Sequence, residues 1–529
     1  MSGSAASVNT IDVDKLENAL LVNRGELFRL GSALIFIVGI MLFTIARSDG
    51  GPHGTLLVIA AMIGGYMALN IGANDVANNV GPAVGSRAIT LTGAIVLAAI
   101  FEAAGAIIAG GDVVGTIKNG IIDPSLIASS DTFIWLMIGA LLAAALWLNA
   151  ATAIGAPVST THSIVGGVLG AGIAAGGWSI ADWWQVGQIA LSWVVSPVLG
   201  GVIAAAFLYL IKRTITYQPN LLDAAQRMVP FLIAIMAWAF STYLILKGLK
   251  KLVRVDFLTA SIVGLAFAAI IYFLMHRYVR RITPALNNSK DGVNQLFTIP
   301  LIFAAALLSF AHGANDVANA VGPLAAINDA IVSGGIASKA SIPLWVMLIG
   351  AFGISVGLAL YGPKLIRTVG SEITELDMSR AYCIAIAAAI TVIIASQLGL
   401  PVSSTHIAVG GVFGVGFLRE YLKVNYSKMI DDIRLHHVDD SPEVVEAFLE
   451  QFETASAQEK GELLREIKEK KGETILHKKE RKGLSKIHRI EIVKRSLLLR
   501  IAAAWVITVP ASGILAAMIF FMIRGALLP

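Results

Sequence analysis

Two acidic residues stand within apolar stretches of the sequence, each inside the same eleven-residue motif. Residues 72–82 read Gly-Ala-Asn-Asp-Val-Ala-Asn-Asn-Val-Gly-Pro, and residues 313–323 repeat ten of these eleven letters. A charged side chain at the centre of a membrane costs about 2.5–3.5 kcal/mol on insertion scales, so such residues are usually paired and functional. Side chains three and four positions apart share one helix face. Each motif therefore predicts one polar face, formed by Asn74, Asp75 and Asn78 in the first copy and by Asn315, Asp316 and Asn319 in the second.

These faces offer carboxylate and amide oxygens, which are the ligands that hard cations prefer. The Gly-Pro steps at 81–82 and 322–323 are expected to break both helices, so that backbone carbonyls can join the cation site. The amide N–H groups of the asparagines also leave donors for an anion.

A second motif is duplicated as well. Residues 157–162 read Pro-Val-Ser-Thr-Thr-His, and residues 401–406 read Pro-Val-Ser-Ser-Thr-His. Proline interrupts a helix, and the residues that follow it would begin a new half-helix, where free N–H groups, hydroxyls and the positive end of the helix dipole converge. An ordinary N-cap explains any single serine of this kind. The symmetric duplication instead favours an oxyanion site formed by Ser159, Thr160, Thr161, Ser403, Ser404 and Thr405.

Three further residues could carry protons. Glu102 is an acid in apolar sequence with no acidic counterpart near residues 351–353, and it could be a proton site, a cation ligand or a structural partner of a polar neighbour. His162 and His406 end the second motif. Each could act on substrate or protons, or be a packed histidine with a hydrogen bond, which is the commoner case for a histidine in a membrane.

The elements that position these residues must be transmembrane helices. The chain has 529 residues, of which 56% are hydrophobic and 14% charged, and its mean hydropathy is +0.76. Apolar runs of about twenty residues recur, which is the length that a helix needs to cross a bilayer. We expect an all-α integral membrane protein with about twelve transmembrane helices, counting 157–175 and 401–418 among the candidates. Cys383 is the sole cysteine, so disulfides are excluded. Sequence motifs of hydrolases, P-loop proteins and zinc proteases are absent, so we do not expect an enzyme or a bound cofactor.

The duplicated motifs predict two transport repeats. We place the first at 55–175, after an N-terminal tail and first transmembrane helix at 1–54. Connecting helices at 176–295 lead to the second repeat at 296–418. A charged, soluble helical insertion follows at 419–495, with 17 of the 40 Lys and Arg residues, and a final transmembrane helix occupies 496–529.

Charge predicts the orientation. Residues 478–495 hold eight basic and two acidic residues before the last helix, whereas 174–190, the matching stretch of the first repeat, holds no Lys or Arg. By the positive-inside rule the insertion is cytoplasmic and the two repeats have inverted topology. The basic stretch at 247–254 does not fit this orientation.

The two motifs together closely resemble those of the inorganic phosphate transporter (PiT) family, and the resemblance covers residues 55–418 and the last helix. It implies symport of inorganic phosphate with a cation by alternating access. The Asn and Asp residues of the first motif would then hold the coupling cations, with Asp75 and Asp316 also touching phosphate, and the Ser and Thr residues of the second would hold the phosphate oxygens. Because the Asn-Asp form is similar to that of sodium-coupled members, sodium is the expected coupling ion.

Several alternatives stay open. The coupling ion could be a proton, the transported species a metal-phosphate, or the substrate sulfate in the same fold. A channel or a receptor derived from a transporter would be a different class of protein. A multi-pass location in the cell (inner) membrane is expected under each reading, and a homodimer stays open.

Overall fold

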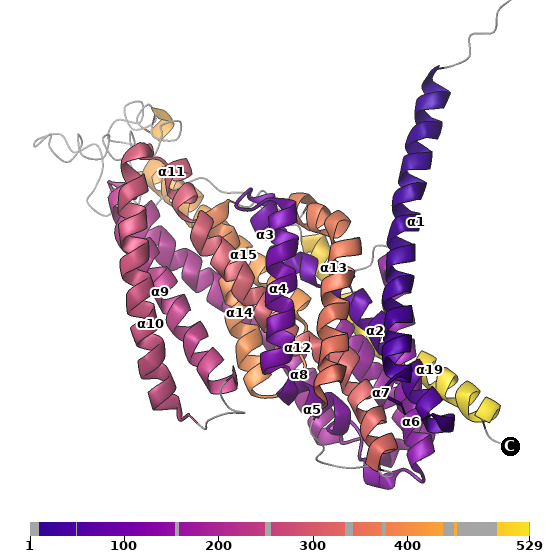
Figure 1. Cartoon of the computed structure of the whole chain (residues 1–529). Helices are drawn as coiled ribbons and strands as arrows, with labels where there is room; N and C mark the ends of the chain where they lie inside the picture. Colours follow the sequence, from indigo (N-terminus) through magenta and orange to yellow (C-terminus); the bar gives the residue numbers. More distant parts are fainter. Residues whose placement is uncertain are drawn as a thin grey trace, which may run out of the picture.

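The computed structural model describes residues 10–48, 50–153, 158–248, 255–333, 342–372, 377–436, 449–451 and 495–527. These residues form a bundle of helices without a strand (Figure 1), and their one β-type pairing is an isolated bridge between Ile122 and Ala181. Eleven helices within the described residues are long and apolar enough to cross a membrane. The predicted all-α, multi-pass membrane fold is therefore confirmed.

The first repeat contains two groups of helices that matter for the site. It begins with the succession α2 (Gly51–Asn74), α3 (Val76–Gly85), α4 (Leu91–Ala109) and α5 (Gly111–Asn119). It ends with the hairpin of α6 (Ser130–Ala153) and α7 (Thr160–Gly176). A short connection joins the base of this hairpin to α5, because the N–H of Asp123 donates to the carbonyl of Ile180 just after α7. The hairpin tip therefore lies inside the bundle and its base at the end that carries α5.

The second repeat is built from α12 (Thr298–Ser333), α13 (Leu344–Glu372), α14 (Met378–Gln397) and α15 (Ser404–His436). Its hairpin, α14 with α15, lies toward the end that carries α11 (Lys290–Leu296), whereas the labels of α5, α6 and α7 lie toward the opposite end (Figure 1). Helix α15 continues without interruption past residue 418, the predicted end of the repeat. Most of the predicted insertion, 437–448 and 452–494, lies outside the described residues.

The remaining helices surround these repeats. Helix α1 (Thr10–Ile45) packs beside α2, and α19 (Arg495–Leu527) packs against α6 and α7. Helix α8 (Trp183–Ile211) continues into a π-helical segment, η3 (Lys212–Thr216), and packs against α15. A pair formed by α9 (Leu221–Gly248) and α10 (Phe257–Ile282) connects the repeats. Short 3-10 turns occur at Pro124–Leu126, Trp178–Ile180 and Thr283–Ala285.

Two glycines allow close crossing of helices at matching places in the repeats. A Cβ on Gly72 in α2 would collide with the carbonyl of Ile354 in α13, and a Cβ on Gly313 in α12 would collide with the carbonyl of Glu102 in α4. Gly72 and Gly313 are equivalent in the duplicated motif, so Ile354 and Glu102 occupy equivalent places.

The expected helix breaks at the Gly-Pro steps are not observed. Pro82 lies inside α3 and Pro323 inside the uninterrupted α12. The first copy of the motif shows only a one-residue interruption at Asp75, between α2 and α3, where the backbone dihedral angles stay helical. A proline has no N–H, so the carbonyls of Asn78 and Asn319, four residues earlier, still lack their normal helical donor. These two carbonyl oxygens can therefore bind another group although the Gly-Pro steps do not break the helices.

The number of membrane-spanning helices is slightly lower than the candidate segments suggested. Two of the candidate segments, 157–175 and 401–418, are not among the eleven helices that are long and apolar enough to cross a membrane. They correspond to α7 and the start of α15. Both begin at a Ser/Thr motif inside the bundle, so they are the returning arms of hairpins.

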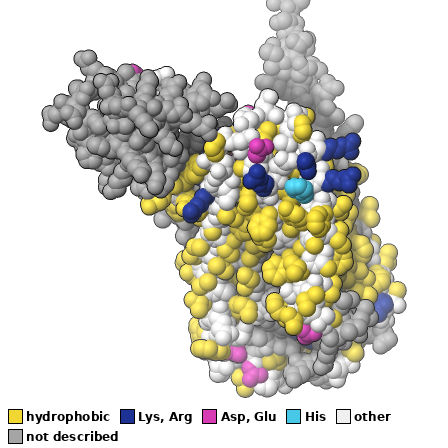
Figure 2. Space-filling view, turned by 90° about the vertical axis from the view of Figure 1, so that its left-hand side faces the viewer, with side chains coloured by type: hydrophobic (Ala, Val, Ile, Leu, Met, Phe, Trp, Pro, Cys, Tyr) yellow, Lys and Arg dark blue, Asp and Glu magenta, His cyan; other side chains and the backbone are white. Residues whose placement is uncertain are grey.

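Charged side chains on the described surface lie mostly toward the ends of the bundle (Figure 2). Figure 2 shows a broad hydrophobic surface, with most of its Lys and Arg side chains gathered toward one end and acidic side chains at both ends. Lys247, in the basic stretch that did not fit, forms an ion pair with Asp112 of α5, which offsets its charge. Residues 249–254 lie outside the described residues.

Candidate functional site

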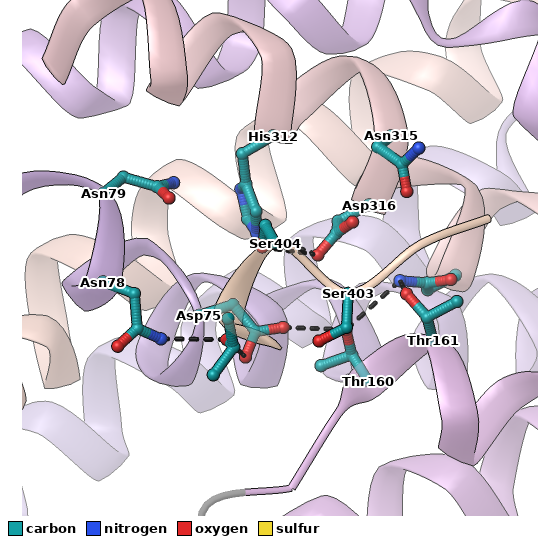
Figure 3. A network of polar contacts seen from close by, with 12 residues as sticks. Asp75, Asn78, Asn79, Thr160, Thr161, His312, Asn315, Asp316, Ser403 and Ser404 are labelled. Carbon is teal, nitrogen blue, oxygen red and sulfur yellow. Dashed lines mark hydrogen bonds and ion pairs between the residues drawn. The ribbon is translucent and has the colours of Figure 1, made fainter. Parts of the chain in front are cut away.

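The two predicted aspartates lie close together in the centre of the bundle. Asp75 and Asp316 are both buried, with 3% and 1% of their surfaces exposed. Single ligand atoms of Asp75, Asp316 and His312 all lie within 4.8 Å of one another. The duplicated motif therefore forms one composite site, to which both repeats contribute a carboxylate (Figure 3).

Hydroxyls from both hairpins surround Asp75. The hydroxyl of Thr160, at the start of α7, donates to Asp75 Oδ2 at 2.7 Å, and the hydroxyl of Thr405, in α15, lies 3.4 Å from Oδ1. Asn78 reaches the same hairpin tip, since its amide donates to the hydroxyl of Thr405 at 2.9 Å. The first motif is thus bound to the hairpin of its own repeat and to that of the other.

Asp316 has one contact of this kind and one that Asp75 lacks. The hydroxyl of Ser404, the counterpart of Thr160, lies 3.5 Å from Asp316 Oδ2. One turn earlier on α12, His312 places Nε2 at 2.9 Å from the same oxygen. Its other ring nitrogen, Nδ1, lies 2.7 Å from Oε2 of Glu102. The amide of Asn79 donates to Glu102 Oε1 at 2.8 Å. Asn79, Glu102, His312 and Asp316 form a continuous buried chain.

The asparagines of the two motifs divide into two pairs by their contacts. Asn319 donates to the hydroxyls of Thr160 and Thr161 at 3.2 and 3.1 Å, as Asn78 does to Thr405. Asn74 donates to Thr152, and Asn315 donates to Ser396 and to the carbonyl of Leu400 and accepts from the N–H of Val402. Asn74 therefore binds the end of α6, and Asn315 binds the end of α14 and the hairpin tip that follows it. Both lie away from the face that Asn78 and Asn319 form with the aspartates.

The Ser/Thr motifs sit at the hairpin tips as the sequence predicts. Helix α7 begins at Thr160 and α15 at Ser404. The hydroxyls of Ser159 and Ser403 accept from the N–H groups of His162 and His406, which is the geometry of an N-cap. Thr161 donates to the carbonyl of Val402, so the two tips touch directly. Pro157 lies outside the described residues.

His162 and His406 meet at the back of the same tips. Their ring centroids are 4.9 Å apart, and Trp193 of α8 lies against His162 at 3.8 Å. Trp193 also donates to the carbonyl of Pro401. Both histidines are buried, and their contacts join the hairpin tips to α8.

The composition of the site favours cations. Three buried acids, Asp75, Glu102 and Asp316, face one histidine, and buried charges need partners. Among the described residues, Asp316 Oδ1 and Asn319 Oδ1 are buried without a hydrogen-bond donor. Oxygens of this kind, with no donor opposite them, are suited to a hard cation such as sodium. The helix N-termini of α7 and α15 provide donors for an anion in the same place.

Asn79 and His312 are part of this network, but the sequence reasoning did not select them. Asn79 lies in the first copy of the Asp-Asn motif, and its counterpart in the second copy is Ala320. His312 directly precedes the second copy, and its counterpart before the first copy is Ile71. The position of His312 could have been found from spacing alone, because it precedes Asp316 by four residues and so shares its helix face.

Comparison with known proteins places nearly the whole chain beside one family of membrane proteins. Residues 71–516 match the phosphate transporter family. A protein of Helicobacter pylori (strain J99), described as a putative phosphate permease, is 51% identical over 519 residues, which are 96% of this chain and 97% of that protein. A putative phosphate permease of Haemophilus influenzae is 40% identical over 70% of this chain and 90% of its own length. A solved structure described as the sodium-dependent phosphate transporter is similar with a TM-score of 0.73 and 32% identity, over 90% of this chain and all of that one.

Proposed function

The chain belongs to the phosphate transporter family, and on that premise we propose that it imports inorganic phosphate by symport with sodium through alternating access. The observation that carries this proposal is the convergence of both Asp-Asn motifs on the N-termini of both hairpin helices. Carboxylate oxygens and asparagine amide groups from each repeat lie beside hydroxyls at the start of both hairpin helices. One composite site can therefore take cations and an oxyanion together.

The hydroxyl contacts suggest how cation and phosphate binding are coupled. The hydrogen of the Thr160 hydroxyl is committed to Asp75, and the oxygen of the same hydroxyl accepts from Asn319. A hydroxyl has one hydrogen to donate. When a sodium ion binds the Asp75 carboxylate, that hydrogen is released and can turn to a phosphate oxygen. Sodium binding would thus precede phosphate binding, and the cation would also screen the aspartates from the anion.

The energetics favour more than one cation. Moving a negative charge into a cell with a negative interior costs about 2.3 kcal/mol per charge per 100 mV. Two aspartates, one from each repeat, provide two places for sodium. At least two sodium ions per phosphate would make import electrogenic and use the membrane potential.

Proton coupling is the second candidate, and one specific observation favours it. His312 lies between two buried carboxylates, Glu102 and Asp316, at 2.7 and 2.9 Å. A histidine so placed can pass a proton between its two ring nitrogens. A proton-coupled mechanism would use this chain, whereas a sodium-coupled one needs it only to hold Asp316.

The test is uptake of labelled phosphate into proteoliposomes with an inward sodium gradient, an inward proton gradient or neither. We expect uptake driven by sodium that is lost in Asp75→Asn and Asp316→Asn. Uptake that follows only the proton gradient would reject sodium coupling and keep phosphate. Excess unlabelled sulfate and arsenate in the same assay address the substrate, since phosphate brings a donor of its own that sulfate lacks at neutral pH. Strong competition by sulfate would reject phosphate selectivity.

A further inference from the structure

Two features between α9 and the second repeat have no part in the phosphate site. One is an apolar cavity of about 200 Å³. The other is a group of basic residues at the end of the bundle that carries α11, which the basic loops predict to be cytoplasmic. They share α14 and the α8–η3 helix, along which one follows the other.

The cavity is lined by apolar side chains of α8, α9, α12 and α14. Phe207, Leu232, Leu307 and Ile390 represent the four helices. Along α14 the lining extends from Tyr382 to Ile394, twelve residues or about 18 Å of helix. Ile235 and Ile394, which also line the cavity, are 38% and 44% exposed, so the cavity opens on the lipid-facing surface.

One polar group belongs to this otherwise apolar cavity. Tyr382 is completely buried, and its hydroxyl has no hydrogen-bond partner among the described residues. Its ring is held edge-on by Phe207, at 6.3 Å between centroids. A buried hydroxyl without a partner is costly, which indicates that a ligand group satisfies it.

The basic group is centred on Lys212, in the π-helical segment that ends α8. Lys290, Arg380 and Arg419 lie on α11, α14 and α15; α11 packs on α14, and both α14 and α15 pack on α8, whose π-helical continuation carries Lys212. Asp377 is paired with Arg380 at 3.1 Å. Four packed elements (η3, α11, α14 and α15) therefore each carry a cation at the same end of the bundle, and Arg419 is only 6% exposed. Such a cluster of like charges is stabilised by an anion.

The cluster and the cavity adjoin along the chain. Arg380 precedes Tyr382 by two residues on α14, and Lys212 follows Phe207 by five residues on the α8–η3 helix. We propose that this is a binding site for an anionic phospholipid of the cytoplasmic leaflet. Its acyl chain fills the cavity, its ester region meets the Tyr382 hydroxyl, and its headgroup phosphate lies on the basic cluster.

A free phosphate ion could satisfy the cluster alone, but it would leave the cavity and Tyr382 unexplained. The lipid accounts for all three, because its apolar chain enters from the bilayer through the opening at Ile235 and Ile394. The site joins α9 of the connecting pair to α12 and α14 of the second repeat. A bound lipid would therefore fix the connecting helices against the hairpin that carries the second Ser/Thr motif.

Native mass spectrometry of the purified full-length protein tests this proposal. The protein is incubated with phosphatidylglycerol or phosphatidylcholine of the same acyl chains, and the bound fraction is compared. We expect preferential retention of phosphatidylglycerol, lowered about fivefold by Lys212→Gln and again by Arg419→Gln. Arg213→Gln is the matched control, since Arg213 is the exposed neighbour of Lys212 and its loss should leave retention unchanged. Equal retention of the two lipids, or an equal loss in the control, would overturn the proposal.

Two further arms separate the alternatives. Millimolar inorganic phosphate that displaces phosphatidylglycerol would overturn the lipid assignment and make the cluster an exit site for substrate.

Ala239→Phe narrows the cavity and should lower retention of phosphatidylglycerol, whereas Ala269→Phe, on the exposed face of α10, should not. Both substitutions add the same apolar ring, so a difference between them reports the cavity rather than general hydrophobicity. Unchanged retention in Ala239→Phe would remove the acyl chain from the proposal.

Discussion

The two copies of the Asp-Asn motif have nearly the same sequence but different surroundings. Asp75 is bound by hydroxyls of both hairpins, at the one-residue interruption between α2 and α3. Asp316 lies in a continuous helix and faces His312, which continues to Glu102 and Asn79. The positions equivalent to His312, Glu102 and Asn79 around Asp75 are Ile71, Ile354 and Ala320. The duplicated residues thus form two similar polar faces. Asn79, Glu102 and His312 occur in one copy only, and they distinguish the surroundings of Asp316 from those of Asp75.

Removing the carboxylates tests whether both faces are needed. Asp75→Asn and Asp316→Asn should each lower sodium-driven phosphate uptake about a hundredfold or more, because truncating one partner of a buried charge pair typically costs about 2–5 kcal/mol. The measurement is initial uptake in proteoliposomes at matched protein amounts. Asp223→Asn, an exposed acid in the first turn of α9, is the control for loss of one negative charge. Sodium-driven uptake that survives in one of the two variants would mean that only the other aspartate holds a coupling cation.

Replacing Glu102 and His312 by isoleucine, the residue at their equivalent positions near Asp75, sharpens the comparison. Glu102→Ile alone should lower the stability by about 3–5 kcal/mol, because it leaves His312 and Asn79 without their buried partner. The double variant Glu102→Ile with His312→Ile copies the surroundings of Asp75 and should recover most of that stability, since apolar replacement of a whole buried pair is often nearly neutral. Thermal unfolding in detergent measures both.

Phosphate uptake by the same double variant shows whether Glu102 and His312 position Asp316 or carry a proton. If Glu102 and His312 only position Asp316, the variant should keep sodium-driven uptake, with a changed sodium dependence. If they carry the coupling proton, uptake should be lost although the protein is stable. A double variant that is as unstable as Glu102→Ile would contradict the view that the two repeats have interchangeable surroundings.

This asymmetry also explains which parts of the site the sequence predicted. The duplicated residues were found because the chain repeats them, and the structure brings Asp75, Asp316, Asn78, Asn319 and both Ser/Thr motifs together. Asn79 and His312 exist in one copy, so duplication could not indicate them, and only Glu102 among the single-copy residues was selected, as an acid in apolar sequence. Histidines 162 and 406 are duplicated, but the repeat does not distinguish a role in the site from packing at the hairpin tips.

The fold was predictable to a similar degree and for related reasons. Long apolar runs fix the all-α membrane architecture, because only helices satisfy the backbone of such segments. Hydropathy does not distinguish a helix that crosses the membrane from one that turns back, so α7 and α15 were counted as spans. The effect of a proline depends on its neighbours in space, and α12 is packed on all sides, which keeps it continuous through Pro323.

The amide contacts to the hairpin tips differ between the repeats by one hydrogen bond. Asn319 donates to two hydroxyls, and Asn78 donates to one. At about 1 kcal/mol per hydrogen bond, Asn78→Ala should lower kcat/KM for phosphate about fivefold, and Asn319→Ala about tenfold to thirtyfold. Asn70→Ala is the control, since Asn70 lies one turn before Asn74 and outside this network. A larger effect of Asn78→Ala would reverse the ranking that the contacts predict.

The serines that begin the two hairpin helices give the smallest effect and separate capping from phosphate binding. Ser159 and Ser403 accept from helix N–H groups at 3.2 and 3.3 Å, so each hydroxyl is an N-cap whose hydrogen can still be donated to another group. Replacing an N-cap serine by alanine costs about 1 kcal/mol, whereas replacing it by glycine costs only a few tenths. Ser159→Gly should therefore keep the fold and remove only the hydroxyl. If the hydroxyl merely caps α7, the KM for phosphate will stay within about twofold, in line with that small cost. If it also donates to phosphate, the KM will rise in Ser159→Gly as much as in Ser159→Ala, and a rise in only one of the two serine positions would show that the hairpins hold the oxyanion unequally.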